Sequence, residues 1–297
     1  SWTASIPGGE TAMEGKWARR MAGGLMVLLF ALAGPTAAQT RSGLMKQLEG
    51  SMLLKGRIDV AADGSVTGFT IADSEQVVPA ALEHVMRHAP NWIVHPATVD
   101  GVPVASSTPF SVRLVARRID DDQYGISIAG VSILDDLPEE AQVRRNDMQP
   151  PRYPTDMLRA GATGIVYLLV RVDASGQTLD AHAEQVNLTV LARPQQAERV
   201  RTRLAQTAIE AARTWTFHTP ASGPHADLRD YVLRIPVEFT FGQSAGYGQW
   251  TVHLPGERTP APWSAPDEDD SRMAGIPGVP MLSGTGLRLR SALEPES

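Results

Sequence analysis

The clearest alternation of apolar and polar positions lies between residues 164 and 186. In the run Gly164–Val172, every second residue is apolar and would lie on one face of an extended strand. The segment Asp173–Gly176 then supplies turn chemistry, because aspartate can bond to its own backbone and glycine readily takes a positive φ. The pattern predicts a β-hairpin that continues through Thr178–Val186. The aligned apolar residues of its first strand are Val166, Leu168, Val170 and Val172.

Helical signals flank this hairpin on both sides. Before it, Tyr153–Gly161 has a proline at a first helical position and a glycine where a helix would stop, which predicts a short helix. After it, apolar residues recur at steps of three and four, which predicts a longer helix that packs on the sheet. The stripe of that helix consists of Val200, Leu204, Ala208, Ala211 and Trp215.

The last strong pattern, Tyr231–Phe241, has the period of two that is typical of a half-buried strand. Pro236 stands in the middle of this run and cannot donate to a sheet ladder, so we expect the strand to lie at an edge or to carry an interruption in its pairing. An edge offers main-chain groups to an added strand, and we expect Arg234 and Glu238 to face outward from it. The candidate partner-binding residues are Tyr231, Val232, Leu233, Arg234, Ile235, Pro236, Val237, Glu238 and Phe239.

Residues 49–118 repeat this order of elements in a shorter form. The segment after Trp92 matches the segment after Trp215, and Val112–Ala116 has apolar and arginine positions in the same order as Leu233–Val237. We interpret the match as a duplication. The other predicted pieces are a strand at Gly56–Val60, a turn at Asp63-Gly64, a strand at Val66–Ala72, and a helix at Pro79–His88 with the stripe Leu82, Val85, Ala89 and Trp92.

The remaining segments lie outside the two repeats. Residues 13–38 begin with basic side chains, continue with the apolar run Met21–Ala33 and end on small residues, the layout of a signal peptide cleaved after Ala38. If it is not cleaved, the same run would be a membrane anchor. Residues 1–12 precede this signal and carry none of their own. The acidic stretch 119–147 is predicted to be a linker with some local order, and the Gly/Pro-rich stretch 242–297 a disordered tail.

The composition and a few single residues argue against nucleic-acid binding, thiol chemistry and metal binding. A net charge of −6, without interleaved basic and aromatic residues, argues against nucleic-acid binding. The chain has no cysteine, which removes disulfides, thiolate metal sites and a cysteine nucleophile. His84 and His88 stand four apart on a predicted helix but lack the glutamate of a metalloprotease signature between them, so we predict neither metal nor cofactor. His95 and His218 occupy equivalent places after the two tryptophans, which inherited packing explains better than catalysis.

The unit at residues 148–241 resembles the TonB C-terminal domain family, and residues 49–118 resemble it more loosely. The resemblance implies an α+β fold of two TonB C-terminal-type domains, each a small antiparallel three-stranded sheet packed with helices. It also implies a periplasmic protein without catalysis. The residues that carry it are Pro150–Pro154, Gly161, Gly164, the strand Val166–Val172, Gly176, Trp215 and the strand Ile235–Phe239.

The resemblance also implies a way of working. Energy transducers of this family link an inner-membrane motor complex to TonB-dependent outer-membrane receptors, and they grip an extended segment of the receptor as a strand added to the sheet edge. The equivalent edge here is Tyr231–Phe239, and the implied partner is an envelope protein of either kind. An anchored energy transducer proper is the alternative, although no long Pro-Glu/Pro-Lys spacer is present. An envelope hydrolase using His95 or His218 is a remote one. Edge strands also self-pair, which leaves a homodimer open.

Overall fold

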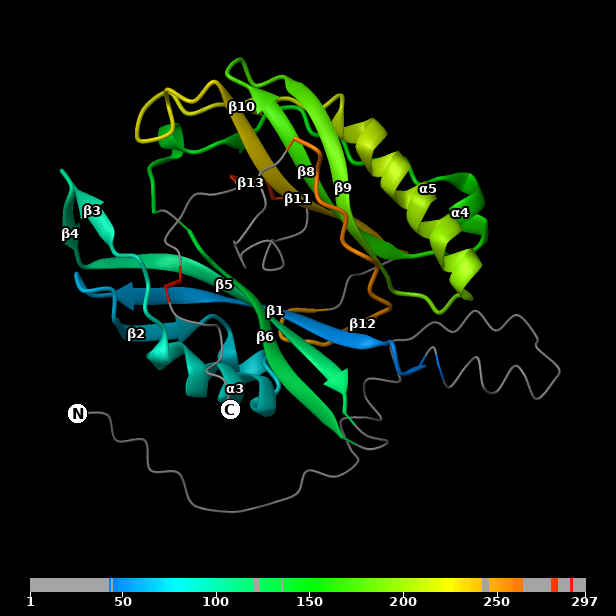
Figure 1. Ribbon diagram of the computed structural model, residues 1–297, viewed down its shortest axis with the longest axis horizontal. Helices are drawn as coiled ribbons and strands as arrows, with labels where there is room; N and C mark the ends of the chain where they lie inside the picture. Colours follow the sequence, from blue (N-terminus) through cyan, green and yellow to red (C-terminus); the bar gives the residue numbers. More distant parts are fainter. Residues whose placement is uncertain are drawn as a thin grey trace.

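The computed structural model describes residues 43, 45–119, 123–134, 136–241, 246–263, 279–282 and 289–290. The described residues form two larger antiparallel sheets, each packed with a helix, and two two-stranded sheets, in agreement with the predicted α+β class (Figure 1). The candidate signal at 13–38 and the segment 1–12 lie outside the described residues. In the part of the chain that is described, no helix is long and apolar enough to cross a membrane.

The first sheet is built around β1 (Glu49–Val60), which pairs with β2 (Val66–Ile71) on one side and with β5 (Ser106–Arg118) on the other. The helix α3 (Pro79–His88) buries Ala81 and Val85 against it. The other elements of this part of the chain are the single-turn helices Ser74–Gln76 and Ala89–Asn91, β3 (Ala97–Val99), β4 (Val102–Val104) and β6 (Tyr124–Ile133).

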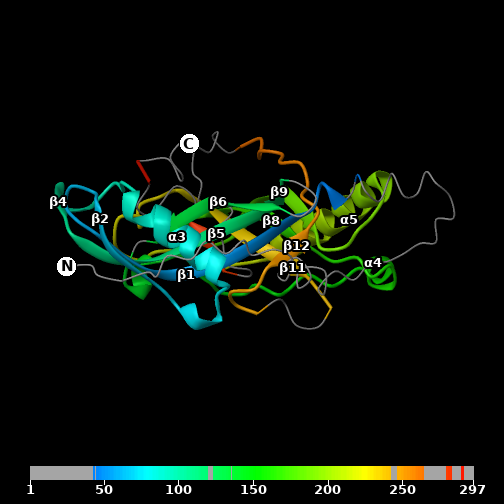
Figure 2. The same cartoon turned by 90° about the horizontal axis from the view of Figure 1, so that it is seen from below.

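The second sheet is built around β8 (Gly164–Asp173), which lies between β9 (Thr178–Leu188) and β11 (Asp230–Phe239). The helix α5 (Pro194–Ala212) covers one face of it. The β3–β4 hairpin and the pair α4 and α5 lie at opposite ends of the molecule (Figure 1, Figure 2). The other elements of this part of the chain are the single-turn helix Glu139–Ala141, β7 (Arg144–Arg145), α4 (Thr155–Arg159), β10 (Phe217–His218), β12 (Thr251–His253) and β13 (Met281–Leu282).

The two hairpins turn with the same side-chain chemistry. The carboxylate of Asp63 accepts hydrogen bonds from the backbone N–H and the hydroxyl of Ser65, at 2.9 and 2.7 Å. The carboxylate of Asp173 accepts the same two bonds from Ser175, at 2.8 and 2.6 Å. In each turn the serine hydroxyl is the main cause that lowers the pKa of the aspartate. The turns predicted at Asp63-Gly64 and at Asp173–Gly176 are therefore both confirmed.

The glycine of each turn lies against the segment that leaves the helix. Gly64, with φ 90°, accepts a hydrogen bond from the N–H of Val94 at 2.8 Å. Gly176, with φ 86°, accepts one from the N–H of Phe217 at 2.8 Å. Val94 and Phe217 each stand two residues after a buried tryptophan. The turn, the helix exit and the tryptophan are therefore joined in the same way in both units.

Most predicted helix positions are confirmed, with small shifts. The helix at Pro79–His88 has the predicted bounds, although Leu82 is only partly buried in its stripe. The helix α5 ends at buried Ala212, so Trp215 of the predicted stripe is buried beyond the helix and Ala211 is only partly buried. Pro154 precedes the first turn of α4 as its N-cap, one position before the first helical position, which the sequence predicts for it. Gly161 follows α4 with a φ of 62°, as expected for a helix stop.

The prediction of a linker at residues 119–147 is wrong for β6, which pairs along the outer side of β5. The apolar residues of β6 alternate with polar ones at even positions in its first half and at odd positions in its second half. A register shift opposite Arg113 and Leu114 moves the alternation by one residue. The shift hides the period of two that would have predicted a strand. The apolar residues of β6 are Ile126 and Ile128 before the shift and Val131 and Ile133 after it.

The prediction of a disordered tail is wrong for residues 246–263, which we call the strap. Its strand β12 pairs with Glu49–Ser51 at the start of β1. Leu254 then exchanges two backbone hydrogen bonds with Leu188 at the end of β9, at 2.7 and 3.0 Å. The strap, orange in Figure 1, therefore joins an edge of the first sheet to an edge of the second. Edge strands supply backbone partners that composition alone does not reveal.

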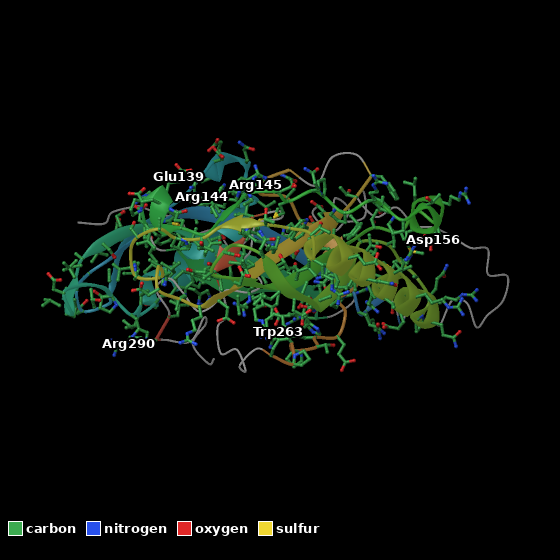
Figure 3. The ribbon with its side chains drawn as sticks, turned by 90° about the horizontal axis from the view of Figure 1, so that it is seen from above. Glu139, Arg144, Arg145, Asp156, Trp263 and Arg290 are labelled. Atoms are coloured by element: carbon green, nitrogen blue, oxygen red, sulfur yellow. The ribbon has the colours of Figure 1, made fainter. Side chains whose placement is uncertain are left out.

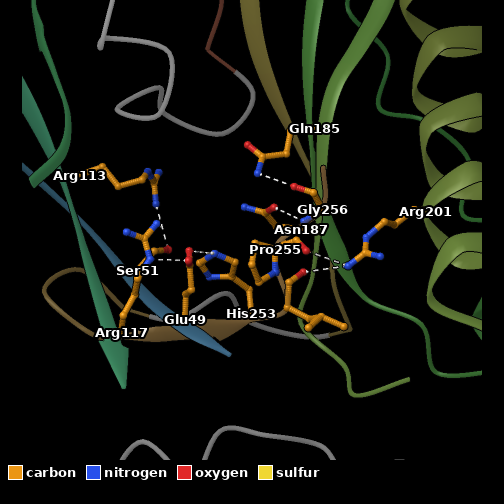
Figure 4. A network of polar contacts seen from close by, with 11 residues as sticks. Glu49, Ser51, Arg113, Arg117, Gln185, Asn187, Arg201, His253, Pro255 and Gly256 are labelled. Atoms are coloured by element: carbon orange, nitrogen blue, oxygen red, sulfur yellow. Dashed lines mark hydrogen bonds and ion pairs between the residues drawn. The ribbon is translucent and has the colours of Figure 1, made fainter. Parts of the chain in front are cut away.

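Further polar contacts hold the strap against the second sheet, as Figure 4 shows. Arg201 of α5 donates to the carbonyl of Pro255 at 3.0 Å. Gln185 of β9 donates to the carbonyl of Gly256 at 2.9 Å, and the N–H of Gly256 donates to Asn187 at 3.1 Å. These contacts satisfy polar backbone groups that a Gly/Pro-rich segment cannot pair within itself.

Glu49 joins the strap to the first sheet. The guanidinium of Arg117 donates to its carboxylate at 2.6 Å, and the ring nitrogen Nε2 of His253 lies 3.6 Å from its second oxygen. Burial acts to raise the pKa of Glu49, but His253 and Arg117 outweigh it and the pKa lies below 4.5. The ionised form of Glu49 therefore stabilises the folded state.

The stability of the chain should depend on pH through this carboxylate. The pKa of Glu49 is lower in the folded state, so its contribution is present above the unfolded value of 4.5 and is lost as the pH falls through the folded value. Urea unfolding of the natural chain and of Glu49→Gln should differ at about pH 7 and converge at about pH 3. An equal difference at both pH values would contradict this assignment.

Candidate functional site

The strand β11 has one fully paired side and one largely unpaired side. It pairs with β8 along its whole length, from Asp230 opposite Asp173 to Phe239 opposite Gly164. On the other side, which we call the open side, the described residues pair with it only at Leu233 and Arg234. The structure therefore places the predicted edge strand one position in from the edge of its sheet, where the two residues of β13 pair with it. The residues gathered there are Tyr231, Val232, Leu233, Arg234, Ile235, Pro236, Val237, Glu238 and Phe239.

The alternation predicted for this strand explains why it stays in the sheet. Tyr231, Leu233, Ile235, Val237 and Phe239 are buried in the core that α5 covers. They fix which face of the strand points inward, because a slip of one residue would expose all of them. Main-chain groups on the open side are thus held in place by side chains that a partner would not touch.

The position of Pro236 shows which backbone N–H groups of β11 point away from β8. It lies opposite Tyr167 in a ladder without a register shift, so its nitrogen faces away from β8. Residues two apart in a strand point their N–H groups to the same side, so Val232 presents its N–H to the open side. The proline is therefore compatible with the sheet and marks the side on which a further strand can pair.

The Pro150–Pro154 motif supports one end of β11. The ring of Tyr153 lies edge-on to Phe239, with ring centres 5.5 Å apart, and stacks on Phe241 at 4.9 Å. Its hydroxyl donates to the carbonyl of Ala162, and burial raises its pKa to about 12. The motif therefore holds the strand end in place, and the tyrosine is neutral at physiological pH.

The prediction that Arg234 faces outward is wrong. Arg234 lies on the face opposite the α5 core, as predicted, but only 4% of it is exposed. Its guanidinium lies 3.9 Å from the buried carboxylate of Glu184 on β9. Arg258 of the strap lies 3.2 Å from the same carboxylate. The strap therefore brings a second cation to the carboxylate that Arg234 faces. Glu238 is partly exposed.

The strap also reaches the middle of this face. Trp263, labelled in Figure 3, lies with its ring 5.6 Å from the guanidinium of Arg171 on β8. Arg171 is opposite Val232 in the ladder. An arginine over a tryptophan ring is a favourable contact. Part of the face beneath the candidate edge is thus occupied by the strap.

The histidines considered for catalysis lie in exposed positions. His95 and His218 follow Val94 and Phe217, the residues that bond to the two turn glycines, and both are exposed. Among the described residues no group of three or more potential ligands could hold a metal ion. The two histidines therefore occupy equivalent positions in the two units.

Gly242–Gly246 reads Gly-Gln-Ser-Ala-Gly, the spelling of a serine-hydrolase nucleophile elbow, which our sequence prediction missed. Residues 242–245 lie outside the described residues. An elbow requires a strand before it and a helix after it. β11 precedes this segment, but the described residues 246–263 that follow contain the strand β12 and no helix. The surroundings of the motif therefore do not match a hydrolase.

Two contributors to the site were also missed from the sequence. The strap carries Arg258 and Trp263, and β13 pairs with the open side of β11. Both lie in the stretch 242–297, where proline, glycine and acidic residues hide short strands. The available signals were weak: Trp250, Val252 and Leu254 alternate over only five residues, and Met281-Leu282 follows a run rich in glycine and proline.

Comparisons with known proteins agree with the family inferred from residues 148–241. No protein-family model matches the chain, and no solved structure gives a significant match. Over 105 residues, 35% of the chain, the sequence is 32% identical to "Protein TonB" from two strains of Xanthomonas campestris pv. campestris. The chain covers 40% of the length of these relatives. This distant similarity supports the presence of a TonB-like C-terminal domain.

Proposed function

We propose that the chain is a non-enzymatic periplasmic protein that binds an extended segment of an envelope partner by adding it as a strand to β11. The observation that carries the proposal is the open side of β11, held by a buried core and marked by Pro236. The similarity to TonB suggests that the partner belongs to TonB-dependent outer-membrane transport, either a receptor or the inner-membrane motor complex. Strand addition needs main-chain groups on an edge, which β11 supplies.

We also propose that residues 49–118 and 148–241 are two copies of one TonB-type domain. In both, the first strand lies between its hairpin partner and the closing strand. In both, a turn glycine bonds to the residue two positions after a buried tryptophan. The copies differ at the closing strand, because β6 covers the outer side of β5. The second copy is then the one that binds the partner.

A proline at Val232 should weaken binding of a partner strand. The substitution removes an N–H that faces the open side and leaves the β8 ladder unchanged. Losing one main-chain hydrogen bond and adding a ring at the edge should reduce affinity by about tenfold or more. The probe is a synthetic peptide that copies the extended periplasmic segment of an outer-membrane receptor, which we call the receptor peptide. Fluorescence anisotropy of the labelled peptide measures its affinity.

Val232→Ala is the matched control, since it shortens the same side chain and keeps the N–H. It should bind the receptor peptide with nearly the affinity of the natural chain. Thermal unfolding of both variants checks that the sheet is intact. Equal affinity for the proline and alanine variants, or no saturable binding by the natural chain, would count against strand addition at β11.

A further inference from the structure

The two closing strands carry different neighbours in the same position. In the first sheet, β6 lies on the side of β5 that faces away from β1. In the second, β13 lies on the side of β11 that faces away from β8. Both neighbours are antiparallel, with Val131 opposite Val112 and Leu282 opposite Leu233. The two contacts lie at different points along the closing strands, because Val112 is opposite Leu54 in β1 whereas Leu233 is opposite Val170, nearer the turn, in β8. β13 therefore lies on the same side of its closing strand as β6 does in the other unit.

The two neighbours differ greatly in extent. β6 has 10 residues and pairs along most of them, and three of its apolar side chains are buried in the first core. β13 has 2 residues, both only partly buried. Leu282 nevertheless packs against the core of the second unit. So short a strand adds little stability, whereas its one apolar contact fixes where it lies.

We propose that the segment Val279–Leu282 is a displaceable internal cap on the binding edge of β11, and that a partner strand must remove it to bind. This inference rests on the proposed function, because it assigns the regulation of the same edge. If only a fraction of the molecules is in the conformation that can bind a partner, the apparent affinity for that partner is reduced by that fraction. The cap would therefore set a threshold of affinity or local concentration that a true partner exceeds.

Replacing Leu282 with lysine should open the edge. The substitution removes the apolar contact with the second core and leaves all of β11 unchanged. A cap that is closed about nine-tenths of the time would make the variant bind the receptor peptide about tenfold more tightly. Val279→Lys is the matched control, since Val279 is 41% exposed and lies outside the two paired residues. It should bind like the natural chain.

A disulfide can lock the cap in place, because the chain has no cysteine of its own. Leu233 and Leu282 are directly opposite in an antiparallel pair, which suits the geometry of a disulfide. The double variant Leu233→Cys with Leu282→Cys should bind the receptor peptide when reduced and lose binding when oxidised. Both forms carry the same loss of core volume, so the reduced form is the control for folding.

The hydrogen-exchange rate of the Arg234 backbone amide reports, without any ligand, whether the cap is paired with β11. Arg234 is two residues from Pro236, so its N–H faces β13, and it should exchange faster in Leu282→Lys than in Val279→Lys. Faster exchange together with tighter binding supports the cap. Equal peptide affinity in the natural chain and Leu282→Lys, or equal affinity in the oxidised and reduced double variant, overturns the cap but leaves strand addition standing. If no form binds the peptide, the proposed function fails, and the exchange rate alone decides whether the cap exists.

Discussion

Replacing Gly176 with alanine is expected to lower the free energy of unfolding by about 3 kcal/mol or more. An added Cβ would lie 1.9 Å from the carbonyl oxygen of Phe217, and the residue has a φ of 86°. The backbone must therefore move as well as adopt a strained conformation. Gly64→Ala should behave alike, because its Cβ would lie 2.1 Å from the carbonyl oxygen of Val94. Urea unfolding monitored by circular dichroism measures both.

Gly101→Ala separates the two causes of this loss. Gly101 has a φ of 78°, but no atom lies within 4 Å of an added Cβ. It should cost only the strain of a left-handed backbone, about 1 kcal/mol. If all three variants lost the same free energy of unfolding, the close approach of the turn to the segment that leaves the helix would not contribute to that loss. The shared geometry would then support duplication less strongly.

Leu254→Ala is expected to destabilise the chain by about 2–5 kcal/mol, although it lies in a stretch whose composition predicts disorder. Leu254 is 4% exposed, belongs to the core of the second unit and follows directly on the pairing of the strap with β1. Its removal leaves a cavity beneath α5 and loosens the link between the sheets. Thermal and urea unfolding measure the loss.

Val252→Ala is the control for this change, because Val252 lies in β12 but is only partly buried. Its loss should be below about 1 kcal/mol. If Leu254→Ala unfolded at the same urea concentration as the natural chain, residues 246–263 would not be part of the folded core.

Signals carried by neighbouring residues allowed much of the fold to be predicted. The hairpin β8–β9 combines β-forming residues with the turn segment Asp173–Gly176, and α3 combines an N-terminal proline with an apolar stripe. β6 was missed because its register shift breaks the alternation within a short acidic stretch. β12 and β13 were missed because strands of 3 and 2 residues carry no period of their own. Their pairing depends on edges that form only in the folded chain.

The candidate edge was predicted in position but not in its surroundings. Pro236 indicated an edge because a missing N–H is a local property of the sequence. Buried Arg234 lies beside Glu184 of another strand, and Glu184 in turn lies beside Arg258 of the strap. No local pattern connects these three positions. Distant charges that meet only through tertiary structure lie beyond what periodicity can indicate.

Hydrogen exchange of the full chain, with and without the receptor peptide at saturation, tests strand addition at β11 most directly. The proposal predicts slower exchange within Tyr231–Phe239, including the N–H of Val232, because a bound strand pairs with the open side. Exchange within Glu184–Leu188 of β9 should stay unchanged, since the strap already covers that edge. Saturable binding with unchanged exchange in Tyr231–Phe239, or with slowing only in other strands, would contradict the account.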